Sequence, residues 1–209
     1  WEHRCLDISL DESCKRLTAR HGYFNNNRLM VSSTWQYVFS ADGTVAITIG
    51  VEVSESAPTL PRVGAALHLS QDPGQVSWFG RGPHENYPDR KHSAVFGQWT
   101  QSTPDMHTPY IFPSENGLRS DVSKARIGRI LIQGEFSLGV SQYSVKQLMA
   151  AQHEHELMPE EGLFINIDGF HMGVGGDDSW SPSVKPRYQL TYPDYHWGFS
   201  LGPSNRTQY

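Results

Sequence analysis

Cysteine is scarce in this sequence: Cys5 and Cys14 are the only two in 209 residues. One possible bridge does not make the disulfide framework on which small secreted domains depend. We therefore expect two free thiols and a cytoplasmic protein, with a Cys5–Cys14 disulfide as the alternative.

Long apolar runs and basic stretches are also missing. No run approaches the roughly 18 residues that a membrane helix needs, and the first residues lack the pattern of a signal peptide. The 17 basic and 22 acidic residues are spread along the chain, and no basic stripe could neutralise a row of phosphates. We expect neither a membrane nor a nucleic acid as partner. Because the sequence begins with Trp1 rather than methionine, we expect a fragment of a longer polypeptide.

Turn-forming and aromatic residues are plentiful, with 19 Gly, 13 Pro, 9 Tyr, 9 Phe and 6 Trp. This composition is typical of short strands joined by turns rather than of long helices, and it favours an all-β class. No repeat, low-complexity tract or linker divides the chain. We expect residues 1–209 to form a single domain.

Apolar residues alternate at 44–53, which predicts a strand with one buried face. Asp42-Gly43 is a tight-turn signal after the β-branched and aromatic run 31–39, so the two runs predict a hairpin. Further strands are expected at 62–70, 75–79, 127–139, 163–168 and 187–201, the last turned back on itself at Pro193-Asp194. One short helix is expected from Ser144 to about Gln152, with Ser144 as its cap and Val145, Leu148 and Met149 on one apolar face.

Two long stretches, 80–126 and 169–186, follow neither the strand nor the helix period. Loops of this length are uncommon in compact domains unless they carry function. The functional site is therefore expected in these stretches.

The segment from Gly173 to Pro182 combines flexible backbone, the adjacent carboxylates Asp177 and Asp178, and the aromatic Trp180. A flat indole on a glycine-rich loop suits stacking on the apolar face of a pyranose ring. A phosphate-binding loop is a poor fit, since no Lys-Ser/Thr follows the glycines. The alternative is that Trp180 is an ordinary core aromatic.

Other polar residues have simpler interpretations. His153-Glu154-His155-Glu156 lacks the His-Glu-x-x-His spacing of a zinc peptidase, so we expect it at the surface or at a strand edge. A glycosidase needs two carboxyl groups about 5 to 9 Å apart, but no spacing selects such a pair. We expect the candidate carboxylates to cap turns or to pair with an arginine such as Arg81, Arg90 or Arg119. The candidates are Glu85, Asp89, Glu115, Asp168, Asp177 and Asp178.

Three blocks in these stretches resemble the C-terminal domain of lacZ-type β-galactosidases and the small subunit of the two-subunit forms. They are Gly80-Arg-Gly-Pro-His-Glu-Asn-Tyr-Pro-Asp-Arg90, Tyr110-Ile-Phe-Pro-Ser-Glu-Asn-Gly-Leu-Arg119 and Asn166-Ile-Asp-Gly-Phe-His-Met-Gly-Val-Gly-Gly-Asp-Asp-Ser-Trp-Ser-Pro-Ser-Val184. Long blocks in the same order are far more specific than a short motif, and the likeness runs from about Arg28 to about Leu201.

The resemblance implies a galactose-mutarotase-like supersandwich, mainly antiparallel, without its first strands and therefore with an exposed sheet edge or apolar patch. In the family, the two catalytic glutamates and the magnesium and sodium ligands belong to earlier domains, chiefly a (β/α)₈ barrel. The resemblance therefore implies that this chain holds no catalytic residue and no metal site. The segment alone is expected to be inactive.

By the same resemblance, Trp180 binds substrate, and Asp177, Asp178 and Ser179 support its loop. The implied parent enzyme is a retaining glycosidase that hydrolyses terminal, non-reducing β-D-galactosides of the lactose type in carbohydrate catabolism. The implied partners are the galactoside, the remaining domains of the enzyme and further copies of it in a homo-oligomer.

Three rival interpretations remain open. The chain could be a stand-alone carbohydrate-binding module, or a mutarotase-like aldose epimerase that uses His84, His107 and His171 with Glu115. It could also be a purely structural interface piece in which Trp180 touches no sugar.

Overall fold

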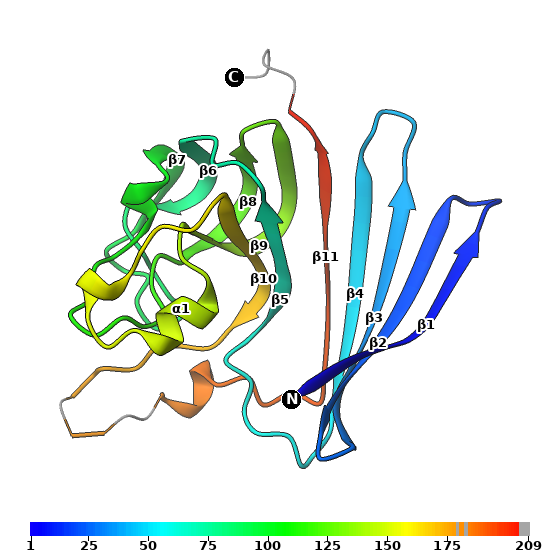
Figure 1. Cartoon of the computed structure of the whole chain (residues 1–209), viewed down its shortest axis with the longest axis horizontal. Helices are drawn as coiled ribbons and strands as arrows, with labels where there is room; N and C mark the ends of the chain where they lie inside the picture. The colour runs from blue at the N-terminus through cyan, green and yellow to red at the C-terminus, as the bar shows by residue number, and fades with distance from the viewer. Residues whose placement is uncertain (179, 182–183, 205–209) are drawn as a thin grey trace.

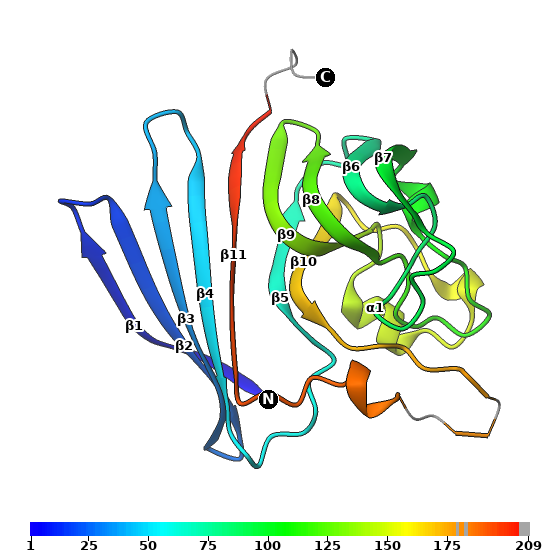
Figure 2. The same cartoon turned by 180° about the vertical axis from the view of Figure 1, so that it is seen from behind.

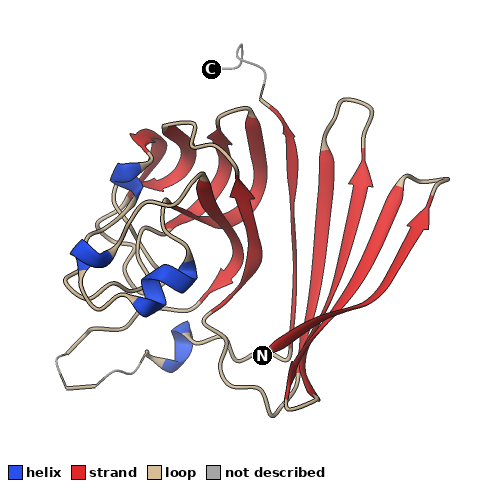
Figure 3. Ribbon diagram, viewed as in Figure 1, coloured by secondary structure: helices blue, strands red, loops and turns tan. Residues whose placement is uncertain are grey.

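The computed structural model describes residues 1–178, 180–181 and 184–204, and strands dominate this part of the chain (Figures 1 and 3). The strands are β1 (Glu2–Asp11), β2 (Arg16–Asn25), β3 (Arg28–Phe39), β4 (Val45–Val53), β5 (Arg62–Leu69), β6 (Gln75–Gly82), β7 (Val95–Ser102), β8 (Arg119–Ile127), β9 (Ile130–Ser141), β10 (Leu163–His171) and β11 (Asp194–Pro203). The single α-helix within the described residues is α1 (Val145–Ala150), and short 3₁₀ turns are η1 (Pro104–Met106), η2 (Glu154–Glu156) and η3 (Pro186–Tyr188).

Every strand pair is antiparallel, which confirms the expected all-β, mainly antiparallel class with one short helix. The strands run in the order β1-β2-β3-β4-β11-β9-β8-β6-β7, and β10 joins β5 to β9 off this path. β9 is the branch point, since residues 130–134 pair with β11 and residues 137–141 pair with β10. Figure 2 shows the result: β1 to β4 stand apart as a wing, while the loops gather beside β6 to β10.

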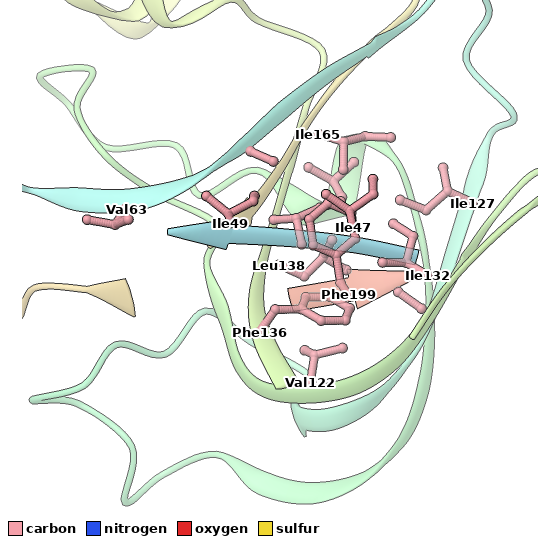
Figure 4. Close-up of a cluster of buried hydrophobic side chains, with 14 of the residues drawn as sticks. Ile47, Ile49, Val63, Val122, Ile127, Ile132, Phe136, Leu138, Ile165 and Phe199 are labelled. Carbon is pink, nitrogen blue, oxygen red and sulfur yellow. The ribbon is translucent and has the colours of Figure 1, made fainter. Parts of the chain in front are cut away.

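The core forms where the wing meets the other strands. Ile47, Ile49 and Val51 are buried, as the alternation at 44–53 predicts, and the β3–β4 hairpin is confirmed. They pack in one cluster with side chains of β8 to β11, including Leu138 and Phe199 (Figure 4). Each fully buried aliphatic side chain contributes about 1.5 to 3 kcal/mol, so this cluster holds the branch point together.

Several sequence predictions were wrong in detail. The stretch 80–126 is not one long loop, because it contains β7 and β8 and the end of β6. Register shifts between Arg119 and Val122 and between Val122 and Lys124 break the alternation of β8, which hides the strand in the sequence. The strand expected at 187–201 begins only at Asp194, after the 3₁₀ turn η3.

β1 lies at the edge of the sheet and is exposed on both faces. Its alternating side chains Leu6, Ile8 and Leu10, here called the β1 row, are 46%, 62% and 61% exposed. The expectation of an exposed sheet edge with an apolar patch is therefore confirmed.

Two smaller expectations can also be scored. Cys5 and Cys14 are free thiols, so the disulfide alternative is wrong. Ser144 caps α1, since its hydroxyl accepts a hydrogen bond from the Gln147 nitrogen at 3.2 Å. The apolar face of α1 is not buried, however, because Met149 is 83% exposed. Among the described residues, no helix has the length and apolar character required to cross a bilayer.

Candidate functional site

The three sequence blocks form contacts with one another, and we call them the first (80–90), second (110–119) and third (166–184) motifs. Glu85 of the first motif accepts hydrogen bonds from the Tyr110 hydroxyl and from the Gly117 nitrogen, the latter at 2.7 Å. The backbone nitrogen of Asn86 donates to the Leu118 carbonyl at 2.8 Å. Burial and the hydrogen bond to Glu85 raise the pKa of Tyr110 to about 12, whereas the nearby Arg90 acts in the opposite direction. The first and second motifs therefore form one unit.

The first motif also holds the third. The Asp89 carboxylate accepts hydrogen bonds from the backbone nitrogens of Val174 at 3.1 Å and Gly175 at 2.8 Å. Next to it, the Arg90 guanidinium donates to the Gly175 carbonyl at 2.7 Å. We call this arrangement the Asp89–Arg90 clamp. It ties the glycine run of the third motif to residues more than eighty positions earlier in the chain.

Beyond the clamp, the third motif carries Trp180, whose side chain is 90% exposed. The Asp178 carboxylate accepts hydrogen bonds from the backbone nitrogens of Ser181 at 2.6 Å and Trp180 at 2.8 Å. These bonds from Ser181 and Trp180 lower the pKa of Asp178. Asp177 forms an ion pair with Lys185 at 2.8 Å.

The core-aromatic interpretation of Trp180 is therefore wrong. Residues 172–178, which follow β10, extend away from the strands in Figure 1. Trp180 likewise belongs to no strand or helix. Ser179, the third expected supporting residue, lies outside the described residues. The sugar-binding role of Trp180 and the supporting roles of its neighbours remain predictions.

A partly buried ionic cluster joins the second and third motifs to β5. Arg62 pairs with Glu115 and also lies 3.6 Å from Asp168, between the Nη1 and Oδ2 atoms. The Nε2 atom of His171 lies 3.8 Å from the Oε1 atom of Glu115, and its Nδ1 atom lies 2.7 Å from the Met172 carbonyl oxygen. The cluster therefore spans β5, β10 and the loop before β8.

The pKa values of the two carboxyls in this cluster are shifted in opposite directions. Burial raises the pKa of Asp168 to about 6, although Arg62 and His171 act against it. For Glu115 burial is outweighed by the nearby His171 and Arg62 side chains, so its pKa lies below the ordinary value. A raised and a lowered carboxyl form the acid and nucleophile of many glycosidases. Here, however, Arg62 pairs with both and Asp168 is almost completely buried, which favours a structural role.

The remaining carboxylates form the kinds of contact that we expected, but not always with the expected partners. Glu85, Asp89 and Asp178 accept backbone hydrogen bonds, and Asp177 forms its ion pair. The three arginines named as examples form other contacts. Arg81 pairs with Asp121, whereas Arg90 and Arg119 donate to backbone carbonyls. The arginine that bridges two candidates is Arg62, which no sequence signal indicated.

Arg119 organises the loops from within, although it is itself a buried charge. Its guanidinium donates to the carbonyls of Pro83, Met106 and Gly117 and to the side chain of Gln101, at 2.8 to 3.1 Å. Burial lowers its pKa to about 10, and the guanidinium remains charged at neutral pH. One side chain thus fixes three loop segments by their backbone oxygens.

The three histidines that the epimerase interpretation would use contact different partners and do not form one site. His84 contacts the Ser93 hydroxyl at 2.9 Å, His107 contacts Glu154 at 2.9 Å, and of the three His171 alone contacts Glu115. His153 is exposed and pairs with Glu156 at 3.1 Å, as expected for a surface tract. Within the described ranges, no group of three or more His, Cys, Asp or Glu side chains is placed to hold a metal ion.

Comparisons with known proteins point to one family. A family model described as "Beta galactosidase small chain" matches residues 7–201. A β-galactosidase of Aeromonas hydrophila is 44% identical over 204 residues, which are 96% of this chain and 20% of the relative. A β-galactosidase of Yersinia enterocolitica is 46% identical over 198 residues, 94% of this chain and 19% of that relative.

Among solved structures, a putative aldose 1-epimerase from Escherichia coli K12 aligns with a TM-score of 0.48 and 12% identity, over 98% of this chain and 69% of the other. The chain spans about one fifth of the length of the curated relatives it matches. The resemblance carried by the three motifs is therefore confirmed, and the chain belongs to the β-galactosidase small-chain family.

Proposed function

We propose that this chain is the part of a β-galactosidase that completes the sugar and aglycone site, while other parts of the enzyme break the bond. The proposed reaction is the retaining hydrolysis of terminal, non-reducing β-D-galactosides of the lactose type. The relatives that match nearly the whole chain are named β-galactosidases, and the chain makes up about one fifth of each. This share leaves ample room for the catalytic groups elsewhere.

The observation that carries the proposal is the exposure of Trp180. A tryptophan that is 90% exposed loses the burial that usually stabilises this residue type. Its indole instead presents a flat apolar face on a loop held by Asp178 and by the clamp. Such a face suits the apolar side of a sugar ring, with a stacking contribution of about 0.5 to 1.5 kcal/mol by analogy with aromatic pairs.

The hydrolytic step is proposed to use groups outside this chain. A retaining glycosidase needs one carboxyl as acid and another as nucleophile, both open to the substrate. The candidate carboxylates here are engaged: Glu85 and Asp89 bind backbone amides, and Arg62 pairs with Glu115 and Asp168. We place the two glutamates, and the magnesium and sodium sites, in the other domains of the parent enzyme.

The same domains are the proposed partners of the exposed surfaces. The β1 row is an apolar strip on an edge strand whose outer side pairs with no described strand, and other parts of a larger protein commonly cover such strips. We propose that the parent enzyme is a cytoplasmic homo-oligomer in which these contacts are made.

The test is Trp180→Ala in the full-length enzyme. Loss of stacking should weaken the binding of galactoside substrates and of sugar acceptors by about 2- to 12-fold, as the free-energy range above implies. Trp180→Phe keeps a flat apolar face and should fall between the wild type and the alanine variant. Met149→Ala removes another highly exposed apolar side chain, on α1, and should leave binding unchanged. Unchanged binding of both ligand types in Trp180→Ala would refute the assignment.

The exposure of Trp180 also fits a stand-alone carbohydrate-binding module. That function predicts sugar binding by the isolated chain with millimolar or better affinity, measurable by calorimetry or NMR titration. The proposed β-galactosidase role instead predicts that the isolated chain binds sugars weakly, since a single projecting aromatic supplies one wall of a site.

A further inference from the structure

We propose that Asp89 and Arg90 are positioning residues for Trp180, acting through the glycine run of the third motif. Their side chains bind both backbone polar groups of Gly175. Its nitrogen donates a hydrogen bond to Asp89, and its carbonyl accepts one from Arg90. The Val174 nitrogen is bound by Asp89 as well. This segment belongs to no strand or helix, so two side chains from a distant loop supply the bonds that a sheet would otherwise provide.

The glycines on either side are shaped to this clamp. A Cβ atom at Gly173 would lie 2.4 Å from the Asp89 Oδ2 atom, closer than any real contact. A Cβ atom at Gly176 would lie 2.5 Å from the Arg90 Nη2 atom, at a φ of +77° that side chains rarely adopt. The glycine run therefore does more than make a turn, because it lets a carboxylate and a guanidinium reach the backbone.

The clamp is the first of three successive fixed points before the indole. Asp89 and Arg90 form hydrogen bonds with the backbone of residues 174–175, and Lys185 forms an ion pair with Asp177. The Asp178 carboxylate accepts a hydrogen bond from the backbone nitrogen of Trp180. A loop fixed at several points loses less freedom when it binds a ligand, so more of the stacking free energy appears as affinity. Without the clamp, the same indole would occupy many orientations, and few would face a sugar.

The Asp89–Arg90 clamp is in turn supported by contacts with the first and second motifs. Arg90 lies near the Tyr110 hydroxyl, which donates to Glu85, and Glu85 holds the second motif. Neither Asp89 nor Arg90 needs to contact the sugar in this arrangement. Their effect on binding should therefore disappear when Trp180 is absent, which separates a positioning role from general stabilisation of the fold.

Because this role rests on the proposed function, the experiment is a double-variant cycle in the full-length enzyme. Asp89→Asn replaces one acceptor oxygen by a donor group that cannot accept from the backbone. We expect a loss in substrate and acceptor affinity of about 2- to 10-fold, close to that of Trp180→Ala. The double variant should lie within about 2-fold of Trp180→Ala, since coupled residues give non-additive effects. The rate of the bond-breaking step at saturating substrate should change less than affinity.

Arg90→Met provides an independent test should Asp89→Asn fold poorly, because it removes the carbonyl donor and leaves the Asp89 hydrogen bonds available. Asp72→Asn is the matched control. Asp72 also accepts a backbone hydrogen bond, from Gly74 at 2.8 Å, but it contacts no part of the third motif in the bonds it forms with Gly74, Thr103 and Gln142. Its affinity for substrate should equal that of the wild type.

The outcomes separate the two proposals. If Trp180→Ala binds substrate and acceptor normally, the proposed function fails. If Trp180→Ala binds weakly but Asp89→Asn and Arg90→Met bind normally, or if the losses multiply in the double variants, the positioning role is overturned and the sugar-binding role of Trp180 stands.

Discussion

Arg62 of β5 and Asp168 of the neighbouring strand β10 form an ion pair, with 3.6 Å between the Nη1 and Oδ2 atoms, and the carboxyl of Asp168 is almost completely buried. The Oδ2 atom has no hydrogen-bond partner among the described residues. An ion pair at this distance compensates only partly for the loss of hydration, which is why the pKa of Asp168 rises to about 6. The negative charge of the ionised Asp168 carboxyl therefore destabilises the folded state.

This relationship predicts a pH dependence of stability. Since the pKa of Asp168 is higher in the folded than in the unfolded chain, the folded state binds more protons between about pH 4 and pH 6. The free energy of unfolding should fall as the pH rises through this window and level off above it. Relative to Asp168→Asn, the wild type should lose on the order of 2 to 3 kcal/mol between pH 4 and pH 7.

Denaturant unfolding of the purified chain at several pH values measures this difference. The lowered pKa of Glu115 produces a change of opposite sign at lower pH, but Glu115 is present in both proteins and its effect largely cancels in the comparison. A difference in unfolding free energy that stays constant from pH 4 to pH 7 would show that Asp168 is not the titrating group.

Arg119 should be irreplaceable by lysine. Lysine keeps the charge but cannot match the planar fork that reaches the carbonyls of Pro83, Met106 and Gly117 together. Buried carbonyls left without a donor are costly, so Arg119→Lys should destabilise the chain by roughly 2 to 4 kcal/mol in chemical unfolding. Arg129→Lys, at the exposed turn between β8 and β9, is the control and should change stability by less than about 0.5 kcal/mol. Equal stability of the two variants would contradict the role of Arg119.

The parts of the fold that the sequence predicts best are those with an undisturbed alternation. The β3–β4 hairpin has both the buried row at 44–53 and the Asp42-Gly43 turn. β8 lacks the undisturbed alternation, because its bulges around Val122 shift the buried positions out of period. β1 alternates Leu6, Ile8 and Leu10 but buries none of them, so no core face distinguishes it from a loop with scattered apolar residues.

For the site, the motifs indicate which residues matter but not what they contact. Asp89 and Gly175 are 86 positions apart, and only the sheet topology brings their loops together. Arg62 stands in no motif, yet it bridges Glu115 and Asp168 because β5 pairs with β10. Partners of this kind depend on register, which a single sequence does not determine when the intervening strands are irregular.

Trp180 should contribute almost nothing to folding. Because its side chain is 90% exposed, Trp180→Ala should change the free energy of unfolding by less than about 0.5 kcal/mol. Trp78→Ala is the matched comparison. Trp78 is fully buried and donates to the Arg81 carbonyl at 3.0 Å, so its removal should cost roughly 3 to 5 kcal/mol. Thermal or denaturant unfolding of both variants checks this, and a large loss for Trp180→Ala would mean that the residue is structural.

The β1 row should drive self-association of the isolated chain. Leu6, Ile8 and Leu10 form an apolar strip on a strand whose outer edge pairs with no other strand of the described ranges, and such strands pair with other copies. Ile8→Lys should reduce the fraction of associated chain in sedimentation velocity or light scattering, with little change in unfolding free energy because the side chain is already exposed. Ser9→Lys adds the same charge to the opposite face of β1 and should reduce association much less. If both variants reduce it equally, net charge rather than the apolar strip controls association, and the interpretation of the β1 row is wrong.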